Sequence, residues 1–338
     1  MVTTPMPNDT DLVLPAAATV EAERALREPV QVPLPELGVI AVSGADAITF
    51  LQAQLTNDVA DLAPEQMQLN GYCTAKGRLL ATFHQWRHGD DVMLRLPREI
   101  LPAVMKRLSM FVLRAKVKLV DASDAWRTVA VLGPGVADRA QRIGAPLPAS
   151  PWTGAVDGER RVDRVPGADD VPDRFLVTTP STASLPEWCA GLPAAQAGTW
   201  WWSEIEAAVP TVFAATQEKF VPQMINFEVL GGVNFRKGCY PGQEVVARSQ
   251  YLGKLKRRMQ RAHVEPAQVQ AAADVYRSGE EQPVGTVVMA APSPRGGTEL
   301  LFEVPVDRLQ EGTMHLVSST GPALALRGLP YELFDPTA

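Results

Sequence analysis

Apolar positions in the first third of the chain follow two different periods. Runs typical of β-strands occur at Gly38–Val42, Arg78–Trp86, Val92–Leu96 and Lys116–Val120. Helical spacing of apolar residues occurs in Ala47–Leu55 and Glu99–Leu113. The resulting order is strand, helix, strand, strand, helix, strand, which is the split βαβ pattern of a ferredoxin-like sheet.

A second unit repeats this order less clearly. Strands are expected at Thr128–Leu132, from Val162 and at Arg174–Thr178, and helices at Val136–Arg142, Thr182–Cys189 and Trp201–Val209. Ala145–Gly158 and Pro166–Pro172 are rich in Pro, Gly and Asp, so they are expected to be loops. The similarity between the units lies in the order of elements and not in a sequence repeat.

The last third of the chain carries only short, closely spaced strand patterns. These are Arg258–Val264, Ala273–Arg277, Gly285–Ala290, Leu300–Val304, Met314–Val317 and Ala323–Leu326. Turns of Gly, Pro, Ser and Asp separate them, and no helix pattern intervenes. Such spacing predicts a small β-barrel or sandwich.

Residues 1–35 are rich in Pro, Ala and Thr and predict a flexible tail with a helical turn at Val20–Leu26. They lack the basic start and apolar run of a signal peptide, and no stretch of the chain is apolar for long enough to cross a bilayer. The 338 residues carry a net charge of −6 and three cysteines. This composition predicts a cytoplasmic protein of a reducing compartment that is not built to coat nucleic acid.

One short stretch concentrates reactive groups. Gly238 and Gly242 break regular structure, and Gln243–Tyr251 has the composition of a short helix. Cys239 is therefore expected on a tight loop before a helix N-terminus, next to the cations Arg236 and Lys237, which favour a thiolate. A small buried cysteine in an ordinary Pro-Gly turn is the alternative, and the residues alone leave both interpretations open.

This stretch also carries a resemblance to a known family. The octapeptide Lys237-Gly238-Cys239-Tyr240-Pro241-Gly242-Gln243-Glu244 resembles the signature of the YgfZ folate-binding proteins, as do Ile205-Glu206-Ala207 and Phe220-Val221-Pro222-Gln223. These proteins are bacterial relatives of a mitochondrial iron–sulfur assembly factor and are similar in structure to the T-protein (aminomethyltransferase) of the glycine cleavage system. The resemblance extends from Leu37 to Leu333.

The resemblance implies an α+β fold. Two ferredoxin-like domains and a C-terminal β-barrel would form an aminomethyltransferase-like ring around a pocket for tetrahydrofolate or a derivative. The division expected on this basis is a tail at 1–35, a folate-binding domain at 36–124, a domain with the cysteine loop at 125–254, and a barrel at 255–335.

The resemblance also implies site residues. Trp200, Glu206, Tyr240 and Arg248 are expected to bind folate, with Trp200 against the pterin and Glu206 at its amino-pyrimidine edge. A run of three tryptophans from Trp200 cannot all face inward on one helix, which favours a functional role. The remaining loop residues expected to act with the thiol of Cys239 are Lys237, Gly238, Tyr240, Gly242, Gln243, Glu244 and Arg248.

Two departures from the family's relatives bear on function. Leu37 stands where an aromatic residue is expected, which puts two-sided stacking of the ligand in doubt. In aminomethyltransferases the strand after the Gly77 turn carries an aspartate that activates folate, and Leu79–Thr82 contain no carboxylate. We therefore expect folate binding without aminomethyl transfer and leave any other enzymatic activity open; a one-carbon transferase with a displaced acid is the alternative.

Two basic stretches give a third hypothesis. Arg236–Arg258 hold seven basic residues and one acidic residue, and Val104–Lys118 hold five basic residues and none that is acidic. They are either solvated faces or a positive rim for a folate polyglutamate tail or an RNA backbone. Direct tRNA contact is the weaker alternative, because no aromatic residues interleave the cations.

The expected role is that of an accessory protein in iron–sulfur cluster assembly or repair. Its partners would be iron–sulfur assembly proteins or client iron–sulfur enzymes, including tRNA-modifying ones, with no membrane contact. The four histidines are scattered and no CxxC occurs, so a self-contained metal site is not expected. A single cysteine cannot hold a cluster alone.

Overall fold

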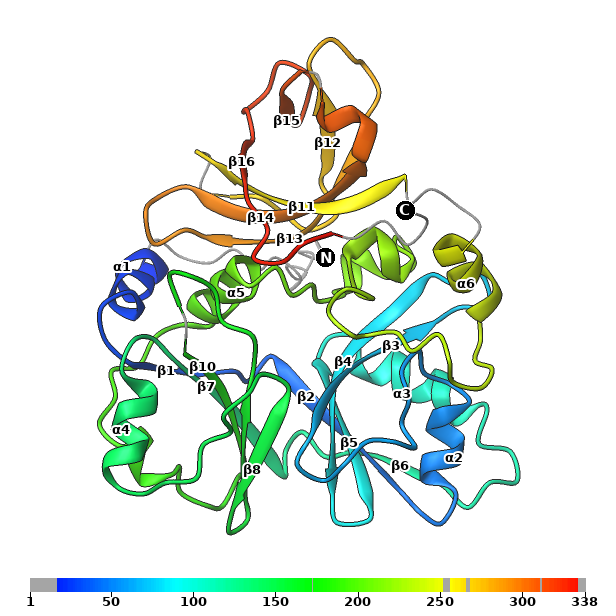
Figure 1. The fold of residues 1–338 in the computed structure, drawn as a ribbon, viewed down its shortest axis with the longest axis vertical. Helices are drawn as coiled ribbons and strands as arrows, with labels where there is room; N and C mark the ends of the chain where they lie inside the picture. The colour runs from blue at the N-terminus through cyan, green and yellow to red at the C-terminus, as the bar shows by residue number, and fades with distance from the viewer. Residues whose placement is uncertain (1–16, 172, 252–255, 266–267, 311, 334–338) are drawn as a thin grey trace, which may run out of the picture.

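The computed structural model describes residues 17–171, 173–251, 256–265, 268–310 and 312–333. It is an α+β protein with three sheets, each forming one lobe of a ring (Figure 1). The fold class expected from the sequence is confirmed. No helix within these residues is long and apolar enough to span a membrane.

The first sheet has the ferredoxin-like arrangement. Its strands are β2 (Leu37–Ser43), β3 (Met67–Cys73), β4 (Leu79–His88), β5 (Asp91–Pro97) and β6 (Lys118–Asp121), in the antiparallel order β3-β4-β5-β2-β6. The helices are α2 (Ala47–Gln52) and α3 (Leu101–Ser109). Ile40, Leu51, Leu94 and Leu101 belong to the core between sheet and helices. Strand β3 is an addition at the sheet edge.

The second sheet follows the same plan. Its strands are β1 (Val30–Pro33), β7 (Trp126–Leu132), β8 (Thr153–Asp157), β9 (Arg160–Arg164) and β10 (Arg174–Pro180), in the order β1-β7-β10-β9-β8. Helix α4 (Val136–Arg142) packs with this sheet, and α5 (Ala197–Glu206) follows it in the chain.

The prediction of a flexible tail over residues 1–35 is wrong for residues 17–33. Residues Ala17–Ala25 form helix α1, and β1 pairs antiparallel with β7, with Val30 opposite Leu132. Strand β1 takes the place beside β7 that β6 takes beside β2 in the first sheet. Val30 and Val32 are buried, because the alternating apolar positions of this segment cover the core. The boundaries expected after residues 124 and 254 stay predictions.

Two further segments differ from expectation. Thr182–Cys189 is not an α-helix, and only Glu187–Cys189 form a 3₁₀ turn (η1). Pro186 precedes that turn, and a proline disfavours helical backbone in the residue before it. The expected loop Ala145–Gly158 contains β8, which forms a hairpin with β9.

The third sheet is the expected C-terminal barrel. Its strands are β11 (Arg257–Val264), β12 (Asp274–Arg277), β13 (Gly285–Pro292), β14 (Thr298–Pro305), β15 (Met314–Leu316) and β16 (Ala325–Arg327), in the order β15-β12-β13-β14-β11-β16. A 3₁₀ turn, η4 (Val306–Leu309), follows β14. The backbone N–H of Leu316 donates to Pro322 O at 2.9 Å, and that of Leu324 to Met314 O at 2.8 Å. These bonds join β15 to the segment leading into β16, so the two ends of the sheet meet.

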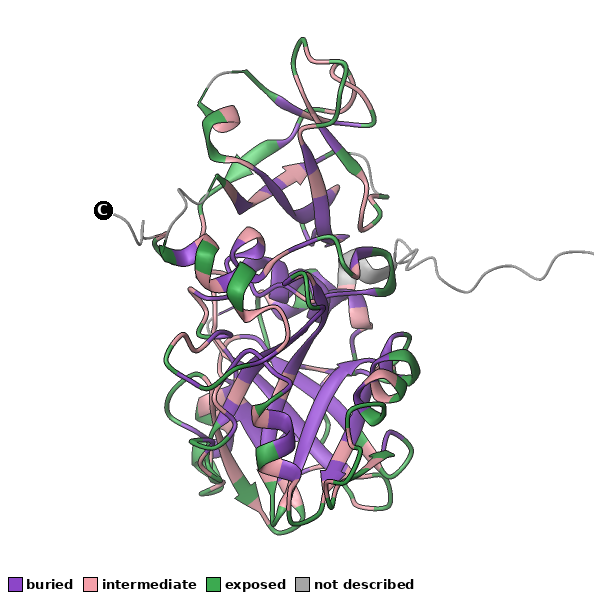
Figure 2. Ribbon diagram, turned by 90° about the vertical axis from the view of Figure 1, so that its right-hand side faces the viewer, coloured by how far each residue is buried: buried purple, intermediate pink, exposed green. Residues whose placement is uncertain are grey.

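Helix α5 lies beneath the barrel strands β13 and β14 and above the lobe of the second sheet (Figure 1), and it also contacts β1 and α1. Trp200, Trp201 and Trp202 are all buried, so the argument that three successive tryptophans cannot all be inside is wrong here. That argument holds for a helix with one solvent face, whereas α5 has neighbours on every side. Figure 2 shows the buried residues continuing from the sheets into this central region.

The segment after α5 contains little regular structure. It holds two 3₁₀ turns, η2 (Ala214–Thr216) and η3 (Pro222–Ile225), and then α6 (Gln243–Tyr251), whose bounds match the predicted helix.

The N-terminal strand should contribute strongly to stability. We expect Val32→Ala to lower the free energy of unfolding by about 2 kcal/mol, because it removes buried methyl groups between β1 and the core. The same substitution at Val156, which is 66% exposed on edge strand β8, should change it by less than about 0.5 kcal/mol. Urea unfolding measures both; equal effects would show that β1 is not part of the cooperative fold.

Candidate functional site

The loop that carries Cys239 is anchored to the first sheet by a buried lysine. The Lys237 ammonium donates to the backbone oxygens of Gln52 and Leu55, both at 2.5 Å, where α2 ends. The Tyr240 ring lies 5.1 Å from the same nitrogen, and burial lowers the pKa of Lys237 to about 8. A cation at these carbonyls compensates the negative end of a helix. Lys237 thus serves as an anchor of the loop, whereas the sequence predicted a cation for the thiol.

Side chains of the first sheet also hold the residues just before the loop. Thr56 Oγ1 donates to Gly232 O at 2.7 Å, and Asn57 Nδ2 donates to Gly231 O at 2.6 Å. Asn234 Oδ1 accepts the backbone N–H groups of the next turn, that of Lys237 at 3.0 Å. Two segments more than 170 residues apart are therefore one structural unit.

Two glycine turns interlock beneath the loop. Gly242 has φ +83°, and a Cβ built on it would lie 2.4 Å from Thr74 O and 2.6 Å from Gly77 N. Gly77 itself has φ +71°. Only glycine fits this close approach of two backbones. The motif position Gly242 is thereby explained by packing.

The loop exposes its thiol. Cys239 is exposed, whereas Cys73 and Cys189 are buried, and burial raises the pKa of Cys189 to about 12. Gly238 is exposed beside it. The buried-turn alternative for Cys239 is therefore wrong. Within the residues that the structure describes, no group of three or more His, Cys, Asp or Glu side chains could hold a metal ion.

The helix after the loop carries its charges at the surface. Glu244 and Arg248 form an i,i+4 ion pair at 2.7 Å, with side chains 83% and 66% exposed. Gln243 Nε2 lies 3.4 Å from Lys237 O and so closes the loop onto the helix start. Tyr240 is buried against Lys237.

A separate small cavity lies between α5 and the first sheet. It is lined by Leu37, Leu69, Thr82, Phe83, His84, Arg95, Leu96, Pro97, Trp200, Trp201, Glu204, Pro210 and Thr211. The structure thus brings Leu37 and Trp200 to one site, whereas Tyr240 and Arg248 are not part of its wall. The cavity volume is about 20 Å³, which is room for one water. A flat ring enters this site only if the wall opens.

The carboxylate in this cavity is Glu204, which sequence reasoning missed. It lies one helical turn after Trp200, and Arg174 pairs with it through a hydrogen bond to Oε1. The Arg174 guanidinium also lies 4.7 Å from the centre of the Trp200 ring. Burial raises the pKa of Glu204, against the lowering effect of Arg174. The i,i+4 spacing from Trp200 is the signal that could have identified it.

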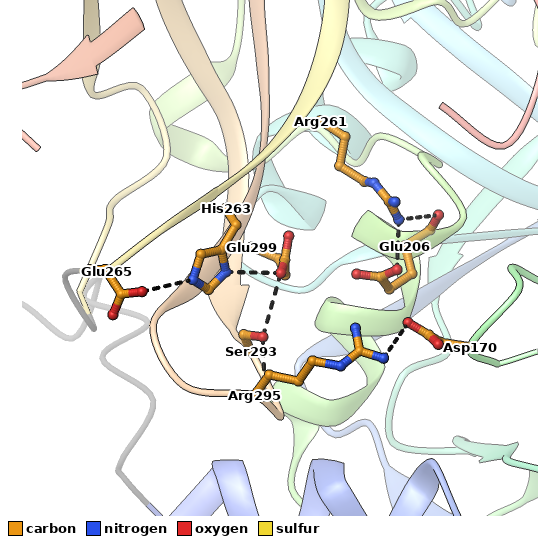
Figure 3. Close-up of polar contacts among 8 residues, drawn as sticks. All are labelled: Asp170, Glu206, Arg261, His263, Glu265, Ser293, Arg295 and Glu299. Carbon is orange, nitrogen blue, oxygen red and sulfur yellow. Dashed lines mark hydrogen bonds and ion pairs between the residues drawn. The ribbon is translucent and has the colours of Figure 1, made fainter. Parts of the chain in front are cut away.

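Glu206 faces the barrel instead. Its carboxylate accepts a hydrogen bond from Arg261 of β11 at 2.6 Å, and Arg261 also donates to its backbone oxygen at 3.1 Å (Figure 3). Residues six positions apart lie on different faces of a helix. The structure therefore does not bring Glu206 to the cavity of Trp200. Two further pairs, His263–Glu299 and Arg295–Asp170, lie beside the Glu206–Arg261 pair (Figure 3).

A second cavity of about 440 Å³ shares Leu37 with the first. It lies between the start of β2 and the β1–β7 edge of the second sheet. Apolar groups such as Leu34 and Trp126 line it together with Arg98 and Arg127. Its volume is within the range of small-molecule sites.

Two cations at the end of the basic stretch after the loop are engaged in ion pairs. Arg257 pairs with Glu303 at 2.6 Å, and Arg258, which is buried, pairs with Glu228 at 2.5 Å. Lys254 lies outside the described residues. By contrast, the cations of the other stretch are mostly exposed, namely Lys106, Arg114, Lys116 and Lys118.

The fold defines the class of protein. The chain is similar to the glycine cleavage system aminomethyltransferase T from Bartonella henselae, with a TM-score of 0.74 and 18% identity over 92% of this chain and 89% of that chain. It has the aminomethyltransferase fold. The search of protein-family models gave no match.

Sequence relatives identify the family. The tRNA-modifying protein YgfZ of Cronobacter sakazakii is 32% identical over 317 residues, covering 89% of this chain and 92% of the relative. That of Colwellia psychrerythraea is 30% identical over 232 residues, covering 69% and 71%, and that of Vibrio vulnificus is 27% identical over 320 residues, covering 93% and 96%. The chain belongs to the YgfZ family.

The glycine contact beneath the loop is testable. We expect Gly242→Ala to destabilise the protein by at least about 2 kcal/mol, because the methyl group meets backbone atoms and the φ is positive. Gly238→Ala is the matched control: its Cβ meets no described atom within 4 Å, so the change should stay below about 0.5 kcal/mol. Chemical denaturation measures both, and a stable Gly242→Ala protein would contradict the packing.

His84 gives a pH prediction. Burial, then the guanidinium groups of Arg95 and Arg174, hold its pKa well below its usual range. In the unfolded chain His84 takes up a proton near pH 6.5 that the folded state does not bind. Its contribution is therefore complete above pH 6.5 and is lost as the pH falls below it, by up to about 1.4 kcal/mol per pH unit.

Comparison with a variant isolates this effect. Between pH 7 and pH 5.5 the wild type should lose more free energy of unfolding than His84→Gln, because only the wild type has the buried histidine. Buried carboxylates with a raised pKa, such as Glu204, favour the folded state as the pH falls, but they do so equally in both proteins. Identical pH slopes would show that His84 does not stay neutral in the folded state.

Proposed function

We propose that the protein is a cytoplasmic folate-binding accessory protein that supports tRNA modification through iron–sulfur cluster assembly or repair. The observation that carries the proposal is the meeting of Trp200, Glu204 and Leu37 in one cavity of an aminomethyltransferase fold. A pterin needs a flat apolar surface and a carboxylate for its amino-pyrimidine edge. The name of the relatives, tRNA-modifying protein, supports the process.

The cavity wall argues against aminomethyl transfer. The turn and strand at Lys76–Thr82 contain no carboxylate, and Thr82 is the residue of this stretch at the wall. Its Oγ1 accepts a hydrogen bond from the backbone N–H of Val212 at 3.1 Å. A threonine held in this way cannot activate a folate nitrogen as a base would.

Ligand entry would use the larger cavity. Leu37 is the wall that the cavities of about 20 and 440 Å³ share. Displacement of its flexible side chain would join the two spaces, so that the pterin reaches Trp200 and the rest of the folate occupies the larger space. A leucine at this position, in place of an aromatic residue, makes that displacement easier because it covers less area.

Cys239 would be the residue that contacts partner proteins. Its thiol is exposed on a loop that Lys237, Thr56 and Asn57 hold rigidly. We propose that it contacts an iron–sulfur assembly protein or a client iron–sulfur enzyme, whose own ligands complete any cluster. Direct tRNA binding is less supported, because Arg257 and Arg258 are engaged in ion pairs.

Complementation and binding should separate the two sites. We expect Cys239→Ala to fold and bind tetrahydrofolate like the wild type but to fail to restore iron–sulfur enzyme activity in a deletion strain. Glu204→Gln, which is isosteric, should weaken tetrahydrofolate binding about tenfold or more, since it removes the charge from a hydrogen-bonding partner. Isothermal titration measures the affinity.

Several outcomes would contradict this assignment. Full rescue by Cys239→Ala would remove the role of the thiol. Turnover of an aminomethyl donor with tetrahydrofolate, at a rate comparable to that of a true aminomethyltransferase, would show a transferase instead. Salt-dependent tRNA binding by the purified protein at low ionic strength would favour direct RNA contact.

A further inference from the structure

Arg95, a cation in the wall of the small cavity, makes its described hydrogen bonds to neutral groups and not to a carboxylate. Arg95 of β5 is only 2% exposed. Its Nη1 donates to Thr178 Oγ1 of the second sheet at 2.8 Å, and its Nη2 lies 3.2 Å from the sulfur of Met67. Its Nε is buried and has no hydrogen-bond partner in the described part of the chain. The guanidinium lies 5.0 Å from the centre of the Trp86 ring.

Other buried arginines are paired. Arg161 forms a 2.7 Å ion pair with Asp163, Arg174 pairs with Glu204, and Arg258 pairs with Glu228. These three satisfy the rule that a buried charge has a partner of opposite sign. Arg95 differs from them: the carboxylates of Asp163 and Glu204 favour its charge, but its described hydrogen bonds go to Thr178 and Met67.

Arg95 nevertheless carries its charge. Burial lowers its pKa, but only to about 10, which is above physiological pH. A sulfur atom is a weak acceptor, and an unpaired buried N–H group is costly. Arginine has five N–H donors and the described contacts of Arg95 engage two of its nitrogens once each, so the guanidinium retains donors for a further acceptor.

The rest of the cavity limits what that acceptor is. Glu204 lines the same space, so a full anion entering beside Arg95 would be repelled by this carboxylate. His84, also in the wall, is neutral, because burial and the two neighbouring guanidinium groups lower its pKa. The wall thus holds a cationic donor, Arg95, and an anionic acceptor, Glu204. Together they fit a neutral ring that has an oxo oxygen and N–H groups side by side on one edge.

We propose that Arg95 is a specificity-determining residue that donates a hydrogen bond to the 4-oxo oxygen of a 2-amino-4-oxopyrimidine-type ring, while Glu204 accepts from the ring N–H and the 2-amino group. This inference rests on the proposed folate function and adds the group that distinguishes 4-oxo from 4-amino rings. A 4-amino ring places a donor against the guanidinium, and this unfavourable pairing is the source of the discrimination.

The test compares two ligands and three proteins. The ligands are tetrahydrofolate and its 4-amino analogue, and the proteins are the wild type, Arg95→Met and Arg258→Met. We expect the wild type to bind the 4-oxo ligand at least about tenfold more tightly, since a charge-assisted hydrogen bond is lost with the analogue. In Arg95→Met this preference should fall to about threefold or less.

Arg258→Met is the matched control. It also removes a buried guanidinium, but Arg258 is not part of the cavity wall, and it binds Glu228 and the backbone oxygen of Gln223. It should lower the melting temperature and leave the ratio of the two affinities unchanged. If the ratio of the two affinities changes in Arg95→Met and not in the control, the effect comes from ligand recognition and not from a general loss of stability.

Each failure has a distinct meaning. If the wild type binds neither ligand, the proposed folate function is wrong and the role of Arg95 falls with it. If the wild type binds tetrahydrofolate but shows no preference over the analogue, only the inference on Arg95 is overturned, even where Arg95→Met does not fold. Persistence of the preference in folded Arg95→Met overturns it as well.

Discussion

The enclosure of helix α5 is the constraint on which the other parts of the structure depend. One helical turn places Trp200 and Glu204 toward the cavity at the first sheet, and the next residues place Glu206 against Arg261 of the barrel. Arg174 of the second sheet holds Glu204. A single ten-residue helix is thus joined to the second sheet and the barrel by two buried or nearly buried ion pairs, and it lines a cavity at the first sheet. Such pairs stabilise the protein weakly but are costly to break, so they fix the relative placement of the lobes.

The N-terminal segment supports this helix from outside. Helix α1 packs against α5, and the Glu21 carboxylate accepts a 2.7 Å hydrogen bond from the backbone N–H of Gln196, at the start of α5. A carboxylate at a helix N-terminus is favourable. Strand β1 then completes the second sheet and leads directly to Leu37, the wall of both cavities. Residues that were predicted to form a tail therefore help to position the walls of the two cavities.

The sequence predicted what local patterns determine and missed what tertiary contacts determine. The strands of the first sheet and the barrel were predictable because alternating apolar residues and turn residues specify them locally. The partner of β1 is β7, about a hundred residues later, and no local signal reports such a pairing. The octapeptide located the exposed Cys239, yet it gave no indication that Lys237 is an anchor. Glu206 was proposed from the motif, and the helical spacing that relates Glu204 to Trp200 was not used.

The thiol loop and the cavity are built on one strand, although they are separate sites. Gly242 of the loop rests on the turn at Gly77, and β4 begins two residues later and carries Thr82 and His84 to the cavity wall. The cavity in its closed form holds only about one water, so a bound ring must displace part of its wall. The contact between Gly77 and Gly242, where two backbones meet without room for a side chain, places the start of β4 directly beneath the loop of Cys239. The strand that supports the thiol loop at one end is therefore the same strand that lines the cavity further along.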